Sequence, residues 1–324
     1  KATTDNAGQA VLKLTPGKQY RFSFHKYGYI LPHARTLTSA DSLAVELTLK
    51  ALAVLAGIVV DDKGSPLADA IVSVTYDRAA VRTNERGEFE IPFHPTLHWP
   101  FRQEVSRNNL LLVRHVRRNL IAVAEIPAAV QSDSIRRYMY KEVIAATQGA
   151  ELDGRVLDSR GKPVADADVE VQSERAEMKL PLYCSARTGA DGTFLLPALP
   201  VGWKYEVQIS RKKYGLASVK TDQTAPGRQP LGNIVLEDAN LSISGKVVDA
   251  AGTPVPNVQL GLFSINGICP LQMDMTTTDA QGGFRFDDLP KGNVELLISL
   301  PDKPGQSQTV KADAGRDDVV VRLE

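Results

Sequence analysis

The sequence is poor in cysteine and in long apolar runs. Only Cys184 and Cys269 occur among its 324 residues, too few for a disulfide framework or a thiolate metal site. Because they stand in different loop contexts, we expect no bridge between them. The longest apolar stretch, residues 51–60, is broken by Gly57 and is far shorter than the roughly 18 residues of a membrane-spanning helix. We therefore predict no membrane-spanning segment.

The chain also lacks an excess of either charge. Lys plus Arg and Asp plus Glu each number 38, so no overall field favours nucleic acid, and we predict no nucleic-acid partner. Zinc-peptidase, nucleophile-elbow and phosphate-loop motifs are missing as well. The sequence thus predicts a protein that is not an enzyme, with no catalytic residues, no cofactor and no metal ligands.

What the sequence does contain is an internal repeat. A threonine is followed four residues later by glycine, two further on by an apolar residue, and six after that by proline. A chain built from one repeating unit is typical of tandem domains. The pattern occurs four times: Thr4, Gly8, Ala10, Pro16; Thr83, Gly87, Phe89, Pro95; Thr188, Gly192, Phe194, Pro200; and Thr278, Gly282, Phe284, Pro290.

A second half-pattern precedes the first one in three of the four repeats. Asp followed by Gly three residues later is typical of a tight turn, since glycine accepts a positive φ. A proline two residues further on suits the point where the chain leaves a strand ladder. The three copies are Gly57, Asp61, Gly64, Pro66; Gly154, Asp158, Gly161, Pro163; and Gly245, Asp249, Gly252, Pro254.

Between these turns apolar residues alternate with period two, which indicates half-buried strands. Inward-facing sets include Leu152 and Val156, and a closing strand is expected at Val45, Leu47 and Leu49. Short alternating strands with regular turns predict an all-β protein made of tandem β-sandwiches. We place four domains: 1–52, a partial repeat that supplies only the later strands and should leave open sheet edges; 53–149, with an Arg-rich insertion; 150–238; and 239–324.

The motifs resemble those of the carboxypeptidase regulatory-like domain. The resemblance is carried by Gly-x-Val-x-Asp-x-x-Gly-x-Pro-Val at 154–164, its counterpart at 245–255, and the Thr-x-x-x-Gly-x-Phe motif. It implies a seven-stranded, transthyretin-like Greek-key sandwich, related in shape to adhesin B-type repeats and starch-binding-like modules. The second repeat also resembles repeats of large bacterial, planctomycete-type extracytoplasmic proteins. The resemblance alone implies an extracytoplasmic location, whether periplasmic, cell-surface or secreted.

One surface of the second repeat is a candidate for binding. Clustered arginines could hold an acidic partner through forked hydrogen bonds, and exposed aromatics could stack on a sugar. An ordinary solvated strand face is the interpretation we favour over binding. The candidate residues are Trp99, Phe101, Arg102, Arg107, Arg114, Arg117 and Arg118.

Four other features have a plainer explanation than chemistry. His94 and His98 flank Pro95, so helical zinc-ligand geometry does not apply to them. Paired turn aspartates such as Asp61 and Asp62 supply too few oxygens for calcium. Trp203, a candidate for sugar stacking, follows a turn where it would cover the sandwich end. An intramolecular isopeptide bond is disfavoured because Lys246 has the strand parity opposite to the core.

The links between repeats, such as residues 50–54, are short and lack Gly/Ser runs, so we expect a semi-rigid rod or arc. The leading hypothesis is a spacer or docking array within a larger protein, with other domains of that chain or another surface protein as partners. The alternative is a carbohydrate- or peptide-binding module that uses loops of the second repeat. Because the chain starts at Lys1 in mid-repeat, we expect it to be a piece of a longer polypeptide.

Overall fold

The computed structural model describes residues 2–17, 19–21, 26, 28–30, 36–38, 44–74, 80–93, 110–126, 136–175, 178–299 and 306–323. Over these residues the structure consists of strands and one short 3-10 helix, η1 (Val116–Arg118). None of the described helical residues forms a segment long and apolar enough to cross a bilayer. The prediction of an all-β fold is confirmed.

The third and fourth repeats have the same seven-stranded sandwich topology, as predicted. Each pairs a three-stranded sheet with a four-stranded one, and the last strand runs parallel to the first. The sheets of the third repeat have the orders β17-β14-β20 and β16-β15-β18-β19, and those of the fourth β24-β21-β27 and β23-β22-β25-β26. The strands are β14 (Ala150–Asp158), β15 (Asp168–Arg175), β16 (Met178–Arg187), β17 (Thr193–Leu199), β18 (Lys204–Ser210), β19 (Leu216–Lys220), β20 (Gly227–Leu236), β21 (Ala239–Val248), β22 (Gln259–Ile265), β23 (Met275–Thr277), β24 (Gly283–Pro290), β25 (Asn293–Ser299), β26 (Ser307–Asp313) and β27 (Val319–Arg322).

The second repeat follows the same plan with a divided last strand. Two short strands, β11 and β12, both run parallel to β5, while β13 joins the edge of the other sheet beside β10. The second sheet has the order β13-β10-β9-β6-β7. The strands are β5 (Ala53–Val60), β6 (Ile71–Val74), β7 (Ala80–Arg82), β8 (Glu88–Phe93), β9 (Leu110–His115), β10 (Leu120–Glu125), β11 (Arg137–Met139), β12 (Ile144–Ala145) and β13 (Thr147–Gln148).

The described part of the first repeat contains only two-stranded pairings. β1 (Gln19–Arg21) pairs with β3 (Thr36–Thr38), and β2 (Tyr29–Ile30) pairs with β4 (Lys50–Ala51), both antiparallel. The closing strand expected at Val45, Leu47 and Leu49 is wrong, because residues 44–49 form no strand and these side chains are exposed or half-buried. Alternation alone could not show that this segment pairs with none of the strands in the described part of the chain.

The aspartate turns form as predicted, with one carboxylate organising each. In the second repeat the Asp61 carboxylate accepts hydrogen bonds from the backbone N–H groups of Lys63 and Ser65 at 3.0 and 2.9 Å. Gly64 closes the turn with φ +77°, a conformation that costs glycine nothing. Asp158 accepts the equivalent pair of backbone bonds in the third repeat, and Asp249 accepts one, from the N–H of Thr253, in the fourth.

In the second, third and fourth repeats the repeated threonine is buried and bonds to the segment that leads into the neighbouring strand. The Thr188 hydroxyl accepts from the N–H of Ala167 at 2.8 Å and donates to the carbonyl of Val164 at 2.7 Å. Thr83 and Thr278 make the same pair of bonds in their own repeats. The threonine therefore satisfies backbone groups that burial would otherwise leave unpaired.

The repeated Gly and Phe are cross-strand neighbours. Gly57 pairs with Phe89, Gly154 with Phe194 and Gly245 with Phe284. A Cβ on Gly154 would come within 2.8 Å of the Phe194 ring, so the glycine makes room for the aromatic ring. The remaining inward positions are buried as predicted: Leu55, Val59, Leu152, Val156, Ile243 and Val247.

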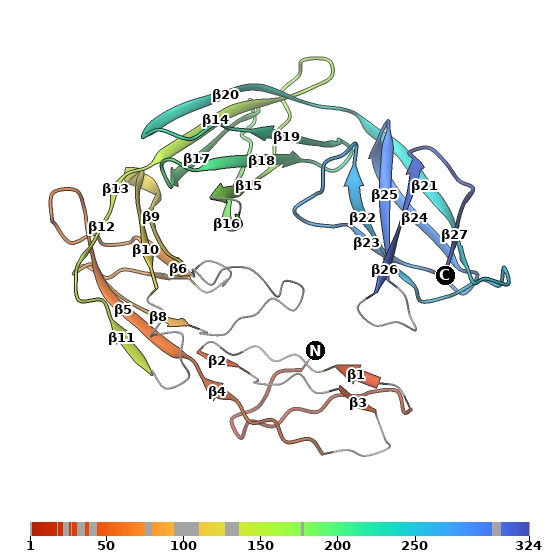
Figure 1. The fold of residues 1–324 in the computed structure, drawn as a ribbon, viewed down its shortest axis with the longest axis horizontal. Helices are drawn as coiled ribbons and strands as arrows, with labels where there is room; N and C mark the ends of the chain where they lie inside the picture. Colours follow the sequence, from red (N-terminus) through yellow and green to blue (C-terminus); the bar gives the residue numbers. More distant parts are fainter. Residues whose placement is uncertain are drawn as a thin grey trace.

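The repeats follow one another along an arc, which runs from β4 through β5 and β14 to β21 (Figure 1). Three cores are buried, one each in the second, third and fourth repeats. The contacts between successive repeats decide whether this arc is fixed, and they form the candidate site.

Candidate functional site

The junction between the second and third repeats is built on one strand, β9. Its residues Leu111 and Val113 belong to the core of the second repeat. Leu110 and Leu112, on the opposite face of the strand, belong to the core of the third. Each fully buried leucine contributes about 1.5–3 kcal/mol. The two repeats therefore share a continuous apolar interface.

Arg114, at the end of the same strand, crosses to the third repeat. Its Nε donates to the carbonyl of Ala198 at 2.9 Å, and its Nη2 donates to the carbonyl of Pro197 at 2.7 Å. The same Nη2 lies 2.9 Å from the Sγ atom of the buried Cys184. Hydrogen bonds from a charged donor contribute about 1.5–3 kcal/mol each.

Asn119 joins three segments at this junction. Its Nδ2 donates to the carbonyl of Gly149 at 2.8 Å, and its Oδ1 accepts from the N–H of Ala198 at 2.7 Å. Its backbone carbonyl accepts from the N–H of Gly149 at 2.8 Å. The residue is 5% exposed and has φ +50°, a left-handed conformation that asparagine tolerates better than most residues.

The junction between the third and fourth repeats depends on a buried glutamine. Gln208 of β18 donates from Nε2 to the carbonyl of Cys269 at 2.9 Å and accepts at Oε1 from the N–H of Leu271 at 2.9 Å. The Gln208 side chain thus donates one hydrogen bond to the backbone of the β22–β23 loop and accepts another from it, as a neighbouring strand would. Gln272 of the same loop donates to Glu170 of β15.

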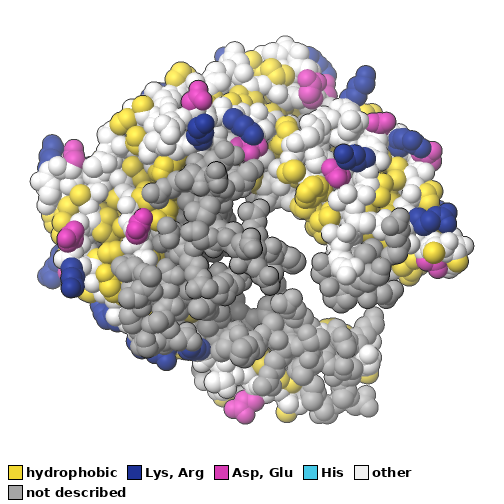
Figure 2. All heavy atoms as spheres, viewed as in Figure 1, with side chains coloured by type: hydrophobic (Ala, Val, Ile, Leu, Met, Phe, Trp, Pro, Cys, Tyr) yellow, Lys and Arg dark blue, Asp and Glu magenta, His cyan; other side chains and the backbone are white. Residues whose placement is uncertain are grey.

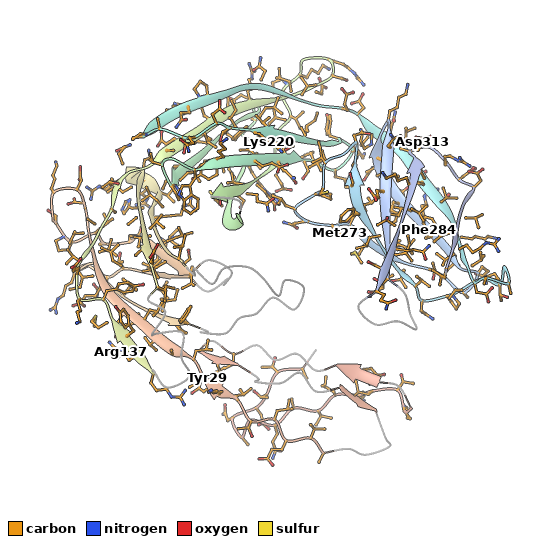
Figure 3. All side chains as sticks on the ribbon, in the orientation of Figure 1. Tyr29, Arg137, Lys220, Met273, Phe284 and Asp313 are labelled. Carbon is orange, nitrogen blue, oxygen red and sulfur yellow. The ribbon has the colours of Figure 1, made fainter. Side chains whose placement is uncertain are left out.

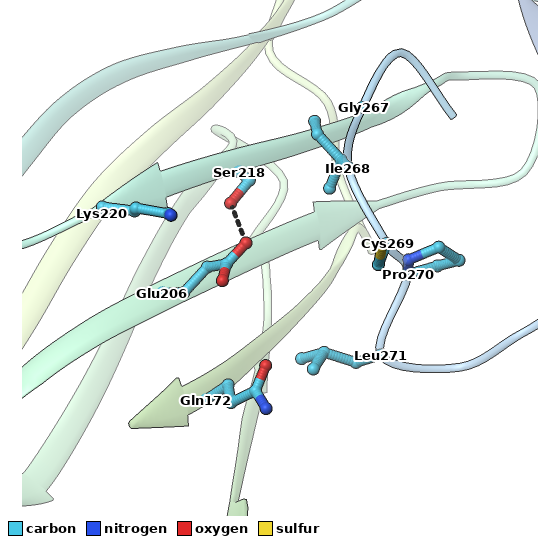
Figure 4. Close-up of a pocket in the computed structure, with 9 residues that line it drawn as sticks. All are labelled: Gln172, Glu206, Ser218, Lys220, Gly267, Ile268, Cys269, Pro270 and Leu271. Carbon is cyan, nitrogen blue, oxygen red and sulfur yellow. Dashed lines mark hydrogen bonds between the residues drawn. The ribbon is translucent and has the colours of Figure 1, made fainter. Parts of the chain in front are cut away.

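A hollow of about 630 Å³ lies at this second junction (Figure 4). The third repeat contributes a polar sheet face, on which Ser218 donates to Glu206 Oε1 at 2.8 Å. The fourth repeat contributes loop 267–271, including the exposed Cys269. The other lining residues are Gln172 and Lys220.

The short link between the third and fourth repeats is hydrogen-bonded to residues 213–215 of the third repeat. Only Glu237 and Asp238 separate β20 from β21. The N–H of Gly215 donates to the carbonyl of Glu237 at 2.8 Å, and the N–H of Ala239 donates to the carbonyl of Lys213 at 2.9 Å. A link held in this way cannot act as a free hinge.

The predicted arginine surface is divided among different contacts. Arg114 faces the third repeat, whereas Arg118 forms an ion pair with Asp61 at 2.8 Å within the second. The Arg118 guanidinium beside Asp61 holds the pKa of that carboxyl below its usual value. Arg117 is exposed and lines a hollow of about 240 Å³ with Arg82 and others. Trp99, Phe101, Arg102 and Arg107 lie outside the described residues, as do His94 and His98, and ligand binding there stays a prediction.

Two other candidates can be placed. Trp203 is 7% exposed and belongs to the core of the third repeat, so its ring covers the sandwich end, and the sugar-stacking interpretation of it is wrong. Lys246 is exposed, with the strand parity expected.

The described residues contain no group of three or more His, Cys, Asp or Glu placed to hold a metal. Basic and acidic side chains are interspersed over the visible face (Figure 2).

Sequence reasoning missed Asn119 and Gln208, since a single polar residue carries no motif. A signal for the junction was present, however. Residues 110–113 are a continuous apolar run rather than an alternating one, and such runs are typical of strands buried on both faces. The run therefore indicates that β9 has a partner on its second face.

The fold and its junctions define a tandem β-sandwich protein. The sequence profile of the carboxypeptidase regulatory-like domain matches residues 151–237 and 242–324, and the chain belongs to that family. No curated protein matches it in sequence.

Several solved structures are similar to this chain at low identity and low TM-score. A streptococcal ancillary pilin is 12% identical, with 84% of this chain and 98% of that chain covered and a TM-score of 0.30. The minor pilin of Streptococcus agalactiae is 14% identical, with 54% and 94% covered and a TM-score of 0.28. The Bacillus anthracis TIE protein is 12% identical, with 90% and 53% covered and a TM-score of 0.25.

Proposed function

We propose that this chain is a non-enzymatic structural module, which holds tandem sandwiches at fixed spacing and orientation within a larger extracytoplasmic protein. The extracytoplasmic location rests on the sequence resemblance to repeats of such proteins. Other domains of that protein, or another surface protein, are the partners in this proposal.

The observation that carries the proposal is the junction made by Arg114 and Asn119. A flexible tether would leave the ends of neighbouring domains solvated. Here two side chains make four hydrogen bonds to backbone atoms of the linker and of the third repeat. The shared strand β9 adds apolar contact on both of its faces. The result is a preferred inter-repeat angle, which a spacer or docking array requires.

The test measures the distance distribution between the second and third repeats. Nitroxide labels are attached at R86C and A190C, two exposed turn positions, in a chain that carries C269S. Electron–electron double resonance should give one narrow distribution. The double variant R114A/N119G should broaden it, because the remaining apolar contact fixes the angle less tightly than directional bonds do.

The matched control is R82A, which removes an arginine whose ion pair with Asp69 is exposed. This substitution should leave the distribution unchanged. A broad distribution in the labelled parent chain would refute the rigid-module proposal, and substrate turnover by the purified chain would refute its non-enzymatic part.

A further inference from the structure

The fourth repeat carries a pair of thioether side chains that no other described repeat has. Met273 and Met275 are two of only four methionines in the chain. Met275 begins β23 and Met273 lies two residues before it, and both side chains lie over the same face of the neighbouring strand, at Gly261. At the position of Met275, three residues before the repeat's threonine, the second and third repeats have Ala80 and Ser185.

Both sulfur atoms converge on one glycine of the neighbouring strand. Gly261 of β22 is the register partner of Met275. The Sδ atoms of Met273 and Met275 each lie under 3.0 Å from the point that a Cβ on Gly261 would occupy. The Asp274 carbonyl accepts from the N–H of Leu262 at 2.9 Å, which fixes the segment against β22.

Position 261 needs a glycine because the two sulfurs occupy the space of a side chain, and not because of its backbone conformation. Gly261 is not among the residues with positive φ, so an ordinary side chain would suit its backbone. A side chain there would instead displace the two sulfurs. Because each sulfur lies under 3.0 Å from the point that a Cβ would occupy, the two are less than 6 Å apart. A soft ion bound between two sulfurs holds them about two metal–sulfur bonds apart, each about 2.3 Å long.

The two methionines can also be reached from solvent. Met275 is 55% exposed, Met273 is half-buried, and the label in Figure 3 places Met273 beside β22 and β23. Thioethers are soft, neutral ligands that select Cu(I) over hard cations such as Mg²⁺ and Ca²⁺. We infer that Met273 and Met275 form a binding site for a soft monovalent cation of the Cu(I) type.

The experiment uses the full chain with C269S, because the exposed thiol of Cys269 would bind such ions on its own. The methionine methyl groups are labelled with carbon-13, and Ag(I) is titrated in chloride-free buffer as an air-stable soft monovalent probe. The methyl resonances of Met273 and Met275 should shift together and saturate at one equivalent. The resonance of Met139, which is 52% exposed, should stay in place and serves as the internal control.

Two variants separate ligation from folding. M275L removes one ligand at nearly constant volume and should weaken Ag(I) binding by about tenfold or more, since even outer-shell losses cost 10–100-fold. G261A keeps both ligands but pushes the sulfurs apart. It should weaken binding while the fold persists, because the atoms it meets are the ends of flexible side chains.

Three results would overturn the inference: no shift at either methionine, a shift at Met139 of equal size, or unchanged binding in both variants. None of these results bears on the proposed spacer function, since Gly261 and the two methionines lie outside the inter-repeat bonds described above.

Discussion

Replacing Asn119 by glycine tests whether one buried amide couples two sandwiches. Glycine keeps the left-handed backbone conformation (φ +50°) and removes only the side chain. The Ala198 N–H then loses its acceptor at the buried junction, which costs about 1–3 kcal/mol. The Gly149 carbonyl retains a bond from the N–H of Gly227, so its loss is nearer 0.5–1.5 kcal/mol. We expect a total loss of about 2–4 kcal/mol.

N119A should cost more than N119G. Alanine loses the same hydrogen bonds and must also adopt a left-handed conformation, which adds about 1–2 kcal/mol. The difference between the two variants therefore measures the backbone contribution separately from that of the side chain.

The assay is hydrogen exchange followed by mass spectrometry on the full chain, since unfolding of several domains does not give a single two-state free energy. Peptides from β9 and β17 should exchange faster in N119G by the factor that corresponds to 2–4 kcal/mol, about 30- to 900-fold. Peptides from β22 and β25, in the fourth repeat, should be unaffected. The matched control is N257G, at an exposed asparagine with φ +61°.

Wild-type exchange rates at β9 and β17 in N119G would refute the reasoning. The same conclusion would follow if N257G and N119G were indistinguishable. Either result would mean that the apolar contact of β9 and the Arg114 bonds couple the repeats without the Asn119 side chain.

Three further predictions concern the repeat motif and its charges. G192A should destabilise the third repeat by more than about 2 kcal/mol, because its Cβ would meet a backbone carbonyl as well as a positive φ, whereas G161A, with the same φ of +78° in open space, should cost about 1 kcal/mol; hydrogen exchange of peptides from β14 and β17 compares the two variants. T188V should cost about 2–4 kcal/mol by leaving two buried backbone groups unpaired, and T188S should restore most of the loss in the same assay. R118A should raise the pKa of Asp61 towards 3.8. Because this pKa is depressed in the folded chain, the stability that the Asp61 carboxylate contributes is present above about pH 4 and is lost as the pH falls through the folded-state pKa. A carboxyl carbon-13 titration in which the pKa of Asp61 is the same in R118A as in the parent chain would contradict the assignment.

The strand parity and the turns could be predicted because each depends on local chemistry. Asp61 and Gly64 form a turn from their own side chain and backbone freedom, wherever the turn is placed. The period-two burial of Leu152 and Val156 likewise needs only a sheet with one buried face. The segment at Val45 has the same alternation, yet it forms no strand and pairs with none of the residues that the structure describes; alternation predicts a strand only where a partner strand is available.

The candidate site could not be predicted, because its residues are distant in sequence. Arg114 and Ala198 are separated by 84 positions, and their contact exists only once two sandwiches meet. Sequence reasoning grouped Arg114 with Arg117 and Arg118 as one surface because they are adjacent in the chain. The strand, the 3-10 turn and the left-handed Asn119 send these side chains in different directions.

By itself, the sequence determined the unit: glycine-bearing turns, a bridging threonine and alternating apolar residues specify a sandwich. The tertiary structure decided how the sandwiches are joined, which side chains are used in joining them, and that two methionines meet over one glycine. The physical reason is the distance along the chain over which each feature is determined. Turn conformation and strand parity are set by neighbours along the chain, whereas a junction is set by the register and packing of surfaces that only the folded repeats possess.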